Sequence, residues 1–125
     1  MSEKRLTVGI PAYKADKELP SCLASIQMQT ISDDVSVIIA TDGVDDNYEY
    51  VKELYPGLDI TVLPCSENTG PGLARQRALD ECKTEWITFI DADDVFMNAL
   101  SLESLLSHIT KGCIEVQGPF YQEVT

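Results

Sequence analysis

The segment at residues 35–40 constrains the fold more than any other part of the sequence. It reads Val-Ser-Val-Ile-Ile-Ala, so it is rich in β-branched side chains and almost wholly apolar. A strand of this composition is typical of a parallel sheet that helices cover on both faces, because neither face of the strand meets water. The segment therefore predicts an α/β protein.

Strand-like and helix-like segments alternate around this strand. Strands are also expected at residues 6–10, closed by Pro11, and at 60–63, 86–90 and 114–118. Apolar residues at helical spacing predict helices near 19–29, capped by Asp16, and near 48–54, 71–82 and 102–109, the last with Gly112 beyond its end. The alternation predicts a single domain over residues 1–125, a three-layer sandwich with a mostly parallel, Rossmann-like sheet.

Polar residues follow the carboxyl ends of the predicted strands. In open parallel sheets, ligands bind outside these ends. We therefore expect one site along this edge, which contains Ala12, Tyr13, Thr41, Asp42, Glu67, Asn68, Asp91, Asp93 and Asp94.

The net charge limits the partners of the chain. It is −12, from 21 acidic and 9 basic side chains, which disfavours non-specific binding of nucleic acid or anionic lipid. Two like unit charges ~4 Å apart also repel by roughly 4 kcal/mol at an effective dielectric near 20. An acidic site that takes a phosphate therefore needs a cation.

The strongest local signal is the acidic turn formed by Asp91, Asp93 and Asp94 after the strand at 86–90. Hard carboxylate oxygens suit Mg²⁺ or Mn²⁺, which take further ligands from substrate phosphates. The alternative is a solvated turn or a helix cap, since Asp is also favoured there. Its position at a strand end, among other polar groups, favours the metal site.

Three further features could contact a nucleotide. Asp42 could bind a ring N–H or ribose hydroxyls, or could simply form a turn before Gly43, and Tyr13 could pack on a base or be a half-buried core residue. The segment 68–72 resembles a phosphate-binding glycine loop, but Arg75 stands where a dinucleotide fingerprint has its third glycine. The helix start with Arg75 or Arg77 could still bind an anion, although both could be solvated arginines. His108 is interpreted as a surface or packed residue rather than a base.

Cellular location is indicated only by absences. The four cysteines lack the two-residue spacing of zinc or redox motifs, so we expect reduced thiols. We identify neither a signal-peptide core nor an apolar run long enough for a transmembrane segment. A cytoplasmic protein is expected.

Several blocks together resemble family 2 glycosyltransferases in order and spacing. They lie at residues 7–14, 22–30, 42–43, 68–70 with 74–75, 89–94 and 118–121. The resemblance implies a GT-A fold, a nucleotide-sugar donor, most often a UDP-sugar, a divalent cation, Mn²⁺ or Mg²⁺, at the acidic turn, and a saccharide or lipid-linked acceptor. By position it implies a nucleotide-sugar site of Pro11, Ala12, Tyr13, Asp42, Asn68, Arg75, Asp91, Ala92 and Asp93, with Asp91, Asp93 and Asp94 as candidate metal ligands.

Some positions depart from the family pattern. Thr41 stands where the family often has an acidic residue before the equivalent of Asp42, and Lys14 stands where it often has asparagine. Gln76 follows Arg75 where the family usually has asparagine. The resemblance also places the catalytic base beyond Thr125, so the chain is expected to be a donor-binding part truncated before the acceptor site, with Glu115 and Glu123 as poor candidates for the base.

Three alternatives stand beside this interpretation. A haloacid-dehalogenase-like phosphatase would use Asp91 as nucleophile and Asp93 as general acid, but that motif normally follows the first strand. A receiver-like signalling module needs an acidic pair after its first strand, which this chain lacks. A non-catalytic nucleotide-sugar-binding fragment would have the same donor half.

Overall fold

Four parallel strands form one sheet in a computed structural model that describes residues 4–43, 47–65 and 70–109. The strand order is β3-β2-β1-β4. The strands are β1 (Leu6–Ala12), β2 (Val35–Thr41), β3 (Asp59–Leu63) and β4 (Trp86–Phe89). The α-helices are α1 (Leu19–Gln27), α2 (Val51–Leu54), α3 (Pro71–Glu81) and α4 (Ser101–Ile109), and η1 (Ser32–Asp34) is a short 3₁₀ helix.

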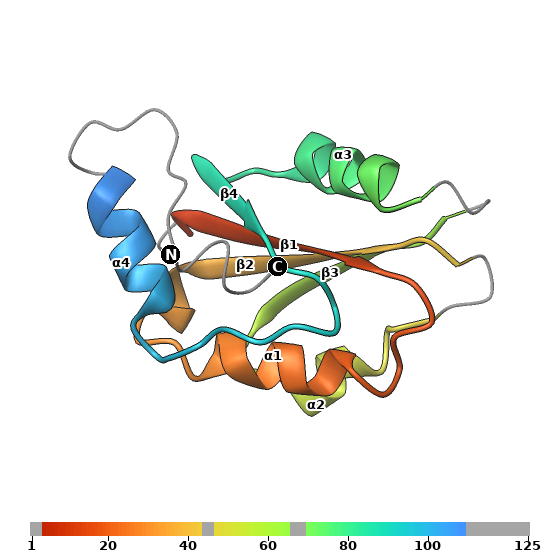
Figure 1. The fold of residues 1–125 in the computed structure, drawn as a ribbon, viewed down its shortest axis with the longest axis horizontal. Helices are drawn as coiled ribbons and strands as arrows, with labels where there is room; N and C mark the ends of the chain where they lie inside the picture. Colours follow the sequence, from red (N-terminus) through yellow and green to blue (C-terminus); the bar gives the residue numbers. More distant parts are fainter. Residues whose placement is uncertain (1–3, 44–46, 66–69, 110–125) are drawn as a thin grey trace.

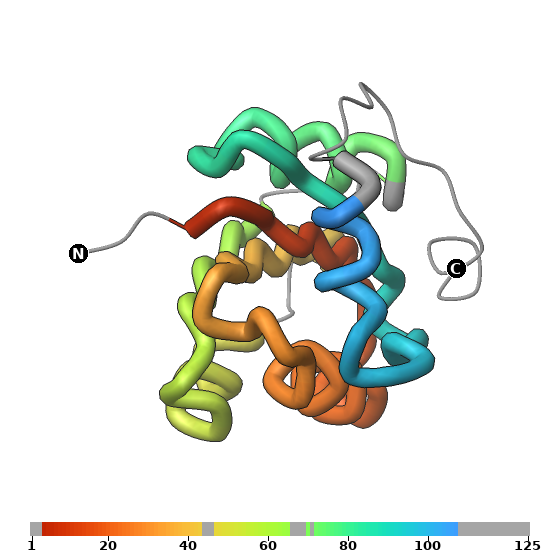
Figure 2. Tube along the Cα trace, turned by 90° about the vertical axis from the view of Figure 1, so that its left-hand side faces the viewer, coloured from red at the N-terminus to blue at the C-terminus, as the bar shows by residue number. Residues whose placement is uncertain are grey.

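The helices cover the sheet in layers, with α3 on one face and α1 and α2 on the other (Figures 1 and 2). The larger hydrophobic cluster joins Leu6, Val8 and Ile10 of β1 to α1 and α4, and the smaller one joins Ile38 and Ala40 of β2 to α3. Residues of opposite parity in the strands therefore face different helices, as expected for a sheet buried on both faces. The predicted three-layer α/β sandwich is confirmed.

Gly9 allows β1, β4 and α3 to pack closely. It is paired with Phe89 of β4, and a Cβ atom at position 9 would lie 2.7 Å from Phe89 Cε1 and 3.5 Å from Ala78 Cβ of α3. Contacts below about 3 Å cannot be accommodated without movement, so the absence of a side chain at this position lets the Phe89 ring lie over β1.

Two local predictions are wrong. β1 does not end before Pro11 but continues to Ala12. β4 pairs with β1 only as far as Gly9, and the residues beyond pair with β2 alone. A missing N–H is tolerated on the edge of β1 that has no strand partner. Asp16 does not cap α1: Glu18 is the N-cap residue, without a side-chain hydrogen bond, and Asp16 Oδ1 instead accepts a hydrogen bond from Tyr50 at 3.3 Å.

The expectations about thiols and membrane spans can be compared with the described residues, whereas several others fall outside them. Cys22, Cys65 and Cys82 are free thiols. Within the three described ranges, no helix is both long enough and apolar enough to cross a membrane. The strand expected at 114–118, Gly112, Glu115 and Glu123 lie outside the described residues, as do Glu67, Asn68 and the side chain of His108.

Candidate functional site

The strand order fixes where a ligand site can form. From β1, the chain steps outward through β2 to β3 and then returns to place β4 on the opposite side of β1. The strand order therefore reverses between β1 and β4, and the crossover from β1 to β2 passes through α1 on one face of the sheet while that from β3 to β4 passes through α3 on the other (Figure 1). Such a switch point, at the carboxyl ends of the strands, is where open α/β sheets bind ligands.

A cavity of about 510 Å³ opens at this switch point, a size typical of small-molecule sites. It is lined by Pro11, Ala12, Tyr13, Lys14, Ala15, Glu18, Asp42, Arg75, Asp91, Ala92 and Asp93. Eight of the nine residues expected to bind the nucleotide sugar are among them, and the ninth, Asn68, lies outside the described residues. Four segments far apart in the sequence, at residues 11–18, 42, 75 and 91–93, thus meet at one cavity.

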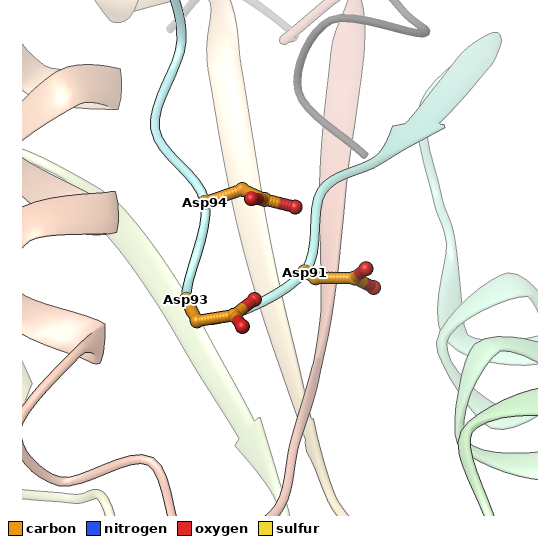
Figure 3. A group of neighbouring side chains, drawn as sticks. All are labelled: Asp91, Asp93 and Asp94. Atoms are coloured by element: carbon orange, nitrogen blue, oxygen red, sulfur yellow. The ribbon is translucent and has the colours of Figure 1, made fainter.

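The acidic turn of Asp91, Asp93 and Asp94 follows β4, and its three side chains project to the same side (Figure 3). Each carboxylate offers an oxygen, and these oxygens lie within 4.8 Å of one another. The Asp94 N–H donates to the Asp91 carbonyl oxygen at 3.0 Å, which closes the turn. Partial burial and then the charges of Asp93 and Asp91 raise the pKa of Asp94. This close set of hard oxygen donors fits a divalent cation.

Arg75 brings a positive charge to the cavity from α3. Its Nη2 lies 3.0 Å from Asp91 Oδ1, and the side chains are 41% and 37% exposed. The ion pair offsets part of the negative charge of the acidic turn. Because the guanidinium is at the cavity wall and has five N–H donors, it can pair with Asp91 and still donate to an anion in the cavity.

Asp42 ends β2 and is only 4% exposed. Its two carboxylate oxygens accept hydrogen bonds from the Gly70 N–H, at 3.0 and 2.9 Å. Gly70 has a φ of 93°, which favours glycine, and directly precedes Pro71, the first residue of α3. Asp42 therefore fixes the start of α3, a role that sequence reasoning missed.

Tyr13 and Lys14 stand at the mouth of the cavity. The Tyr13 ring is half exposed, and Lys14 Nζ lies 5.3 Å from its centroid, within range of a cation–π contact. Lys14 has a φ of 49°, rare for a residue with a side chain. Lys14, Ala15 and Glu18 were not expected in the site. One signal was available for position 14: the family commonly has asparagine there, and asparagine tolerates the positive φ found at this position.

Arg77 has a different environment from Arg75 although it lies two residues away. Its Nη1 donates to the Thr41 carbonyl oxygen at 2.9 Å, and its Nη2 to the carbonyl oxygens of Leu63 and Pro64 at 3.2 and 3.3 Å. Arg77 therefore ties α3 to the ends of β2 and β3. Of the two arginines expected near an anion, only Arg75 lines the cavity.

Comparison with known proteins gives the family. The model of glycosyl transferase family 2 matches residues 7–123. The chain belongs to this family. The resemblance identified from the sequence is thus confirmed, and the phosphatase and receiver alternatives are excluded.

Relatives of known name agree with this assignment. The chain is 34% identical over 93 residues to a teichoic acid poly(glycerol phosphate) polymerase of Staphylococcus epidermidis, covering 72% of this chain and 13% of the relative. It is 33% identical over 97 residues to the uncharacterized glycosyltransferase YibD of Escherichia coli, covering 74% and 27%. The chain spans between 13% and 39% of the length of such curated relatives.

A solved structure supports the fold. S. aureus TarS 1–349 in complex with UDP-GlcNAc matches with a TM-score of 0.77 and 26% identity, over 86% of this chain and 31% of that one. The fold of this family 2 chain is therefore of the GT-A type, as the sequence predicted.

Proposed function

We propose that this chain forms a nucleotide-sugar-binding domain of a glycosyltransferase that uses a UDP-sugar and a divalent cation. The observation that carries the proposal is the cavity at the switch point, where the acidic turn and Arg75 meet Tyr13 and Asp42. Its volume suits a nucleotide-sized ligand. The UDP-GlcNAc complex of TarS, which shares the fold, supports a UDP-sugar donor.

The nucleoside would lie against β1 and β2. Pro11, Ala12 and Tyr13 would form the wall beside the base, and the half-exposed Tyr13 ring can stack on it. The Asp42 carboxylate faces the cavity while it accepts the Gly70 N–H, and a carboxylate oxygen has lone pairs for a second donor. Asp42 would thus accept a base N–H or a ribose hydroxyl.

The diphosphate would lie toward β4. Arg75 would donate to its oxygens, and Asn68, which lies outside the described residues, stays a predicted contact of the nucleotide sugar. Asp91, Asp93 and Asp94 would hold Mn²⁺ or Mg²⁺, with Ala92 forming the cavity wall between them. When bound, the cation would supply Lewis-acid stabilisation of the charge that grows on the leaving diphosphate.

The second half of the reaction needs an acceptor and a base. We propose a saccharide or lipid-linked acceptor and a cytoplasmic location, and we assign the general base to none of the described residues. A base must come within about 2.6 to 3.2 Å of the acceptor hydroxyl, whereas the cavity acids are expected to contact nucleotide and cation.

Calorimetry with UDP tests the donor site. We expect UDP to bind in the presence of Mn²⁺ and to bind at least about 10-fold more weakly with a chelator, since the acidic cavity then repels the diphosphate. Asp93→Asn should weaken binding by a similar factor. Asp33→Asn is a matched control: it makes the same change of charge at an exposed residue of η1, which precedes the amino end of β2.

Two results would contradict the proposal. Equal UDP affinity in Mn²⁺ and in chelator would remove the role of the cation. Equal affinity of Asp93→Asn and Asp33→Asn would remove the role of the acidic turn. Binding of GDP as tight as that of UDP would contradict only the choice of base.

A further inference from the structure

The segment between β4 and α4, residues 90–100, carries the acidic turn but contains no helix or strand. Its backbone groups therefore need hydrogen-bond partners outside regular structure. Figure 1 shows the segment running alongside α1. Much of what holds it is supplied by polar side chains of α1 and of the turn that follows α1.

Cys22 and Ser25 begin this polar stripe. They are three residues apart, so they lie on the same face of α1. The Cys22 thiol donates to the Asp91 carbonyl oxygen at 3.8 Å. Ser25 Oγ donates to the Cys22 carbonyl oxygen at 2.7 Å and accepts the Phe96 N–H at 3.1 Å. The segment is thus held on either side of Asp93 and Asp94.

Gln29 extends the stripe by another four residues and is only 4% exposed. Its Nε2 donates to the carbonyl oxygens of Asn98 at 2.7 Å and Ser25 at 3.2 Å. Its Oε1 accepts the Leu102 N–H at 2.9 Å, one of the first N–H groups of α4, which have no partner within the helix. One buried amide therefore joins α1, the segment and α4.

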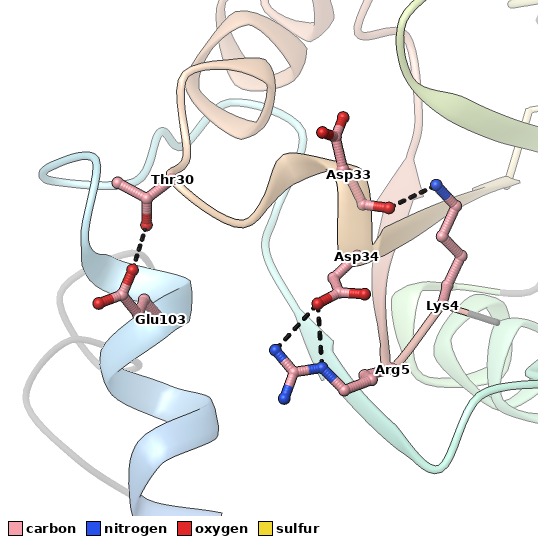
Figure 4. A network of polar contacts seen from close by, with 6 residues as sticks. All are labelled: Lys4, Arg5, Thr30, Asp33, Asp34 and Glu103. Atoms are coloured by element: carbon pink, nitrogen blue, oxygen red, sulfur yellow. Dashed lines mark hydrogen bonds and ion pairs between the residues drawn. The ribbon is translucent and has the colours of Figure 1, made fainter. Parts of the chain in front are cut away.

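Thr30 reinforces this junction. Its N–H donates to the Ala99 carbonyl oxygen at 2.9 Å, and its hydroxyl donates to Glu103 Oε1 at 2.7 Å (Figure 4). None of Cys22, Ser25, Gln29 and Thr30 lines the cavity. Their contacts can influence ligand binding only by fixing where the acidic turn lies.

We propose that Gln29, assisted by Ser25, is a positioning residue for the acidic turn, holding its carboxylates where they can bind the cation and the diphosphate. The inference rests on the proposed function of that turn. Groups that hold metal ligands in place commonly influence metal affinity by about 10-fold to 100-fold when they are removed.

The test replaces Gln29 by Met, which keeps much of the length and removes both hydrogen-bonding groups. Gln27→Met makes the same change at an exposed position of α1 and is the matched control. The first readout is amide hydrogen exchange without metal. We expect the Asp94 amide, which closes the turn at 3.0 Å, to exchange at least about 10-fold faster in Gln29→Met, while the β2 amides exchange at their wild-type rates.

The second readout is Mn²⁺ affinity in the presence of UDP, measured well below the unfolding temperature. We expect Gln29→Met to lower it on the order of 10-fold and Gln27→Met to leave it unchanged. If Gln29 merely stabilised the fold, Gln29→Met would lower the unfolding temperature but would change neither the Mn²⁺ affinity nor the exchange of the Asp94 amide relative to the β2 amides.

The outcomes separate the two proposals. The positioning role is overturned if folded Gln29→Met exchanges its Asp94 amide at the wild-type rate, or if it binds Mn²⁺ with the wild-type affinity. If the wild-type chain binds neither Mn²⁺ nor UDP, the proposed function fails and the Asp94 exchange alone decides the positioning role. If Gln29→Met does not fold, Ser25→Ala replaces it, with Ser21→Ala at an exposed position of α1 as its control.

Discussion

Arg75 and Arg77 lie two residues apart on α3, and the substitution Arg→Met should affect them differently. Arg77 donates to three backbone carbonyl oxygens at the ends of β2 and β3, so its removal should destabilise the fold. Arg75 pairs with Asp91 at the cavity, so its removal should affect ligand binding more than stability.

The contacts set the expected magnitudes. Hydrogen bonds from a charged donor contribute about 1.5 to 3 kcal/mol each, but only the 2.9 Å bond to Thr41 is short and the other two share one nitrogen. We therefore expect Arg77→Met to lower the free energy of unfolding by about 2 to 3 kcal/mol. The partly exposed Arg75–Asp91 pair should contribute only roughly 0.2 to 1 kcal/mol.

Thermal unfolding and UDP calorimetry on both variants check this contrast. At roughly 4 °C per kcal/mol for a domain of this size, Arg77→Met should lower the Tm by about 10 °C and Arg75→Met by less than about 4 °C. UDP affinity should fall in Arg75→Met and change little in Arg77→Met. The Tm of Arg77→Lys should lie between that of the wild type and that of Arg77→Met, because lysine keeps the charge but lacks the planar guanidinium. Equal Tm losses, or an unchanged Tm in Arg77→Met, would refute the reasoning.

Three further predictions concern the scaffold. Asp42→Ala removes the acceptor of the Gly70 N–H and should cost about 1 to 3 kcal/mol in urea unfolding, whereas Asp42→Asn, which keeps an oxygen, should cost less; equal costs would contradict this. Gly9→Ala should cost about 1 to 3 kcal/mol, because its Cβ would meet the Phe89 ring at 2.7 Å, and Phe89→Leu should recover part of the loss. Burial, followed by the charges of the acidic turn, raises the pKa of Cys22 from 9.0 to about 12, so between these two pH values the unfolded chain loses this proton while the folded chain keeps it. Stability should then fall with rising pH by up to about 1.4 kcal/mol per unit, and Cys22→Ala should flatten that slope.

The sequence predicts the layers of this fold well, because burial on both faces leaves a strong pattern. The apolar run of β2 and the spacing of Leu19, Leu23 and Ile26 in α1 each depend on which side chains avoid water. Strand ends are predicted less well: β1 continues through Pro11 because β4 stops pairing at Gly9. Whether a neighbour is still paired at a given residue is a property of the sheet, which no single segment encodes.

The contacts that hold the site together were missed for a related reason. The bond from Gly70 to Asp42 spans 28 residues, and that from Leu102 to Gln29 spans 73. A buried amide or carboxylate carries no local signal of its partner. Likewise, composition cannot show that Arg75 reaches the cavity and Arg77 the strand ends, since that depends on how α3 is rotated against the sheet.

The acidic turn shows how topology changes the meaning of a weak motif. Two aspartates separated by one residue are common in solvated turns, so the motif alone says little. In this chain they follow β4, which lies beside β1 only because the chain returns across the sheet after β3. That return places Asp91 next to the end of β1. It also brings α3, with Arg75, across the face of the sheet opposite to α1. The approach of Arg75 to Asp91, the cavity and the switch point therefore have one common cause, the position of β4 in the sheet.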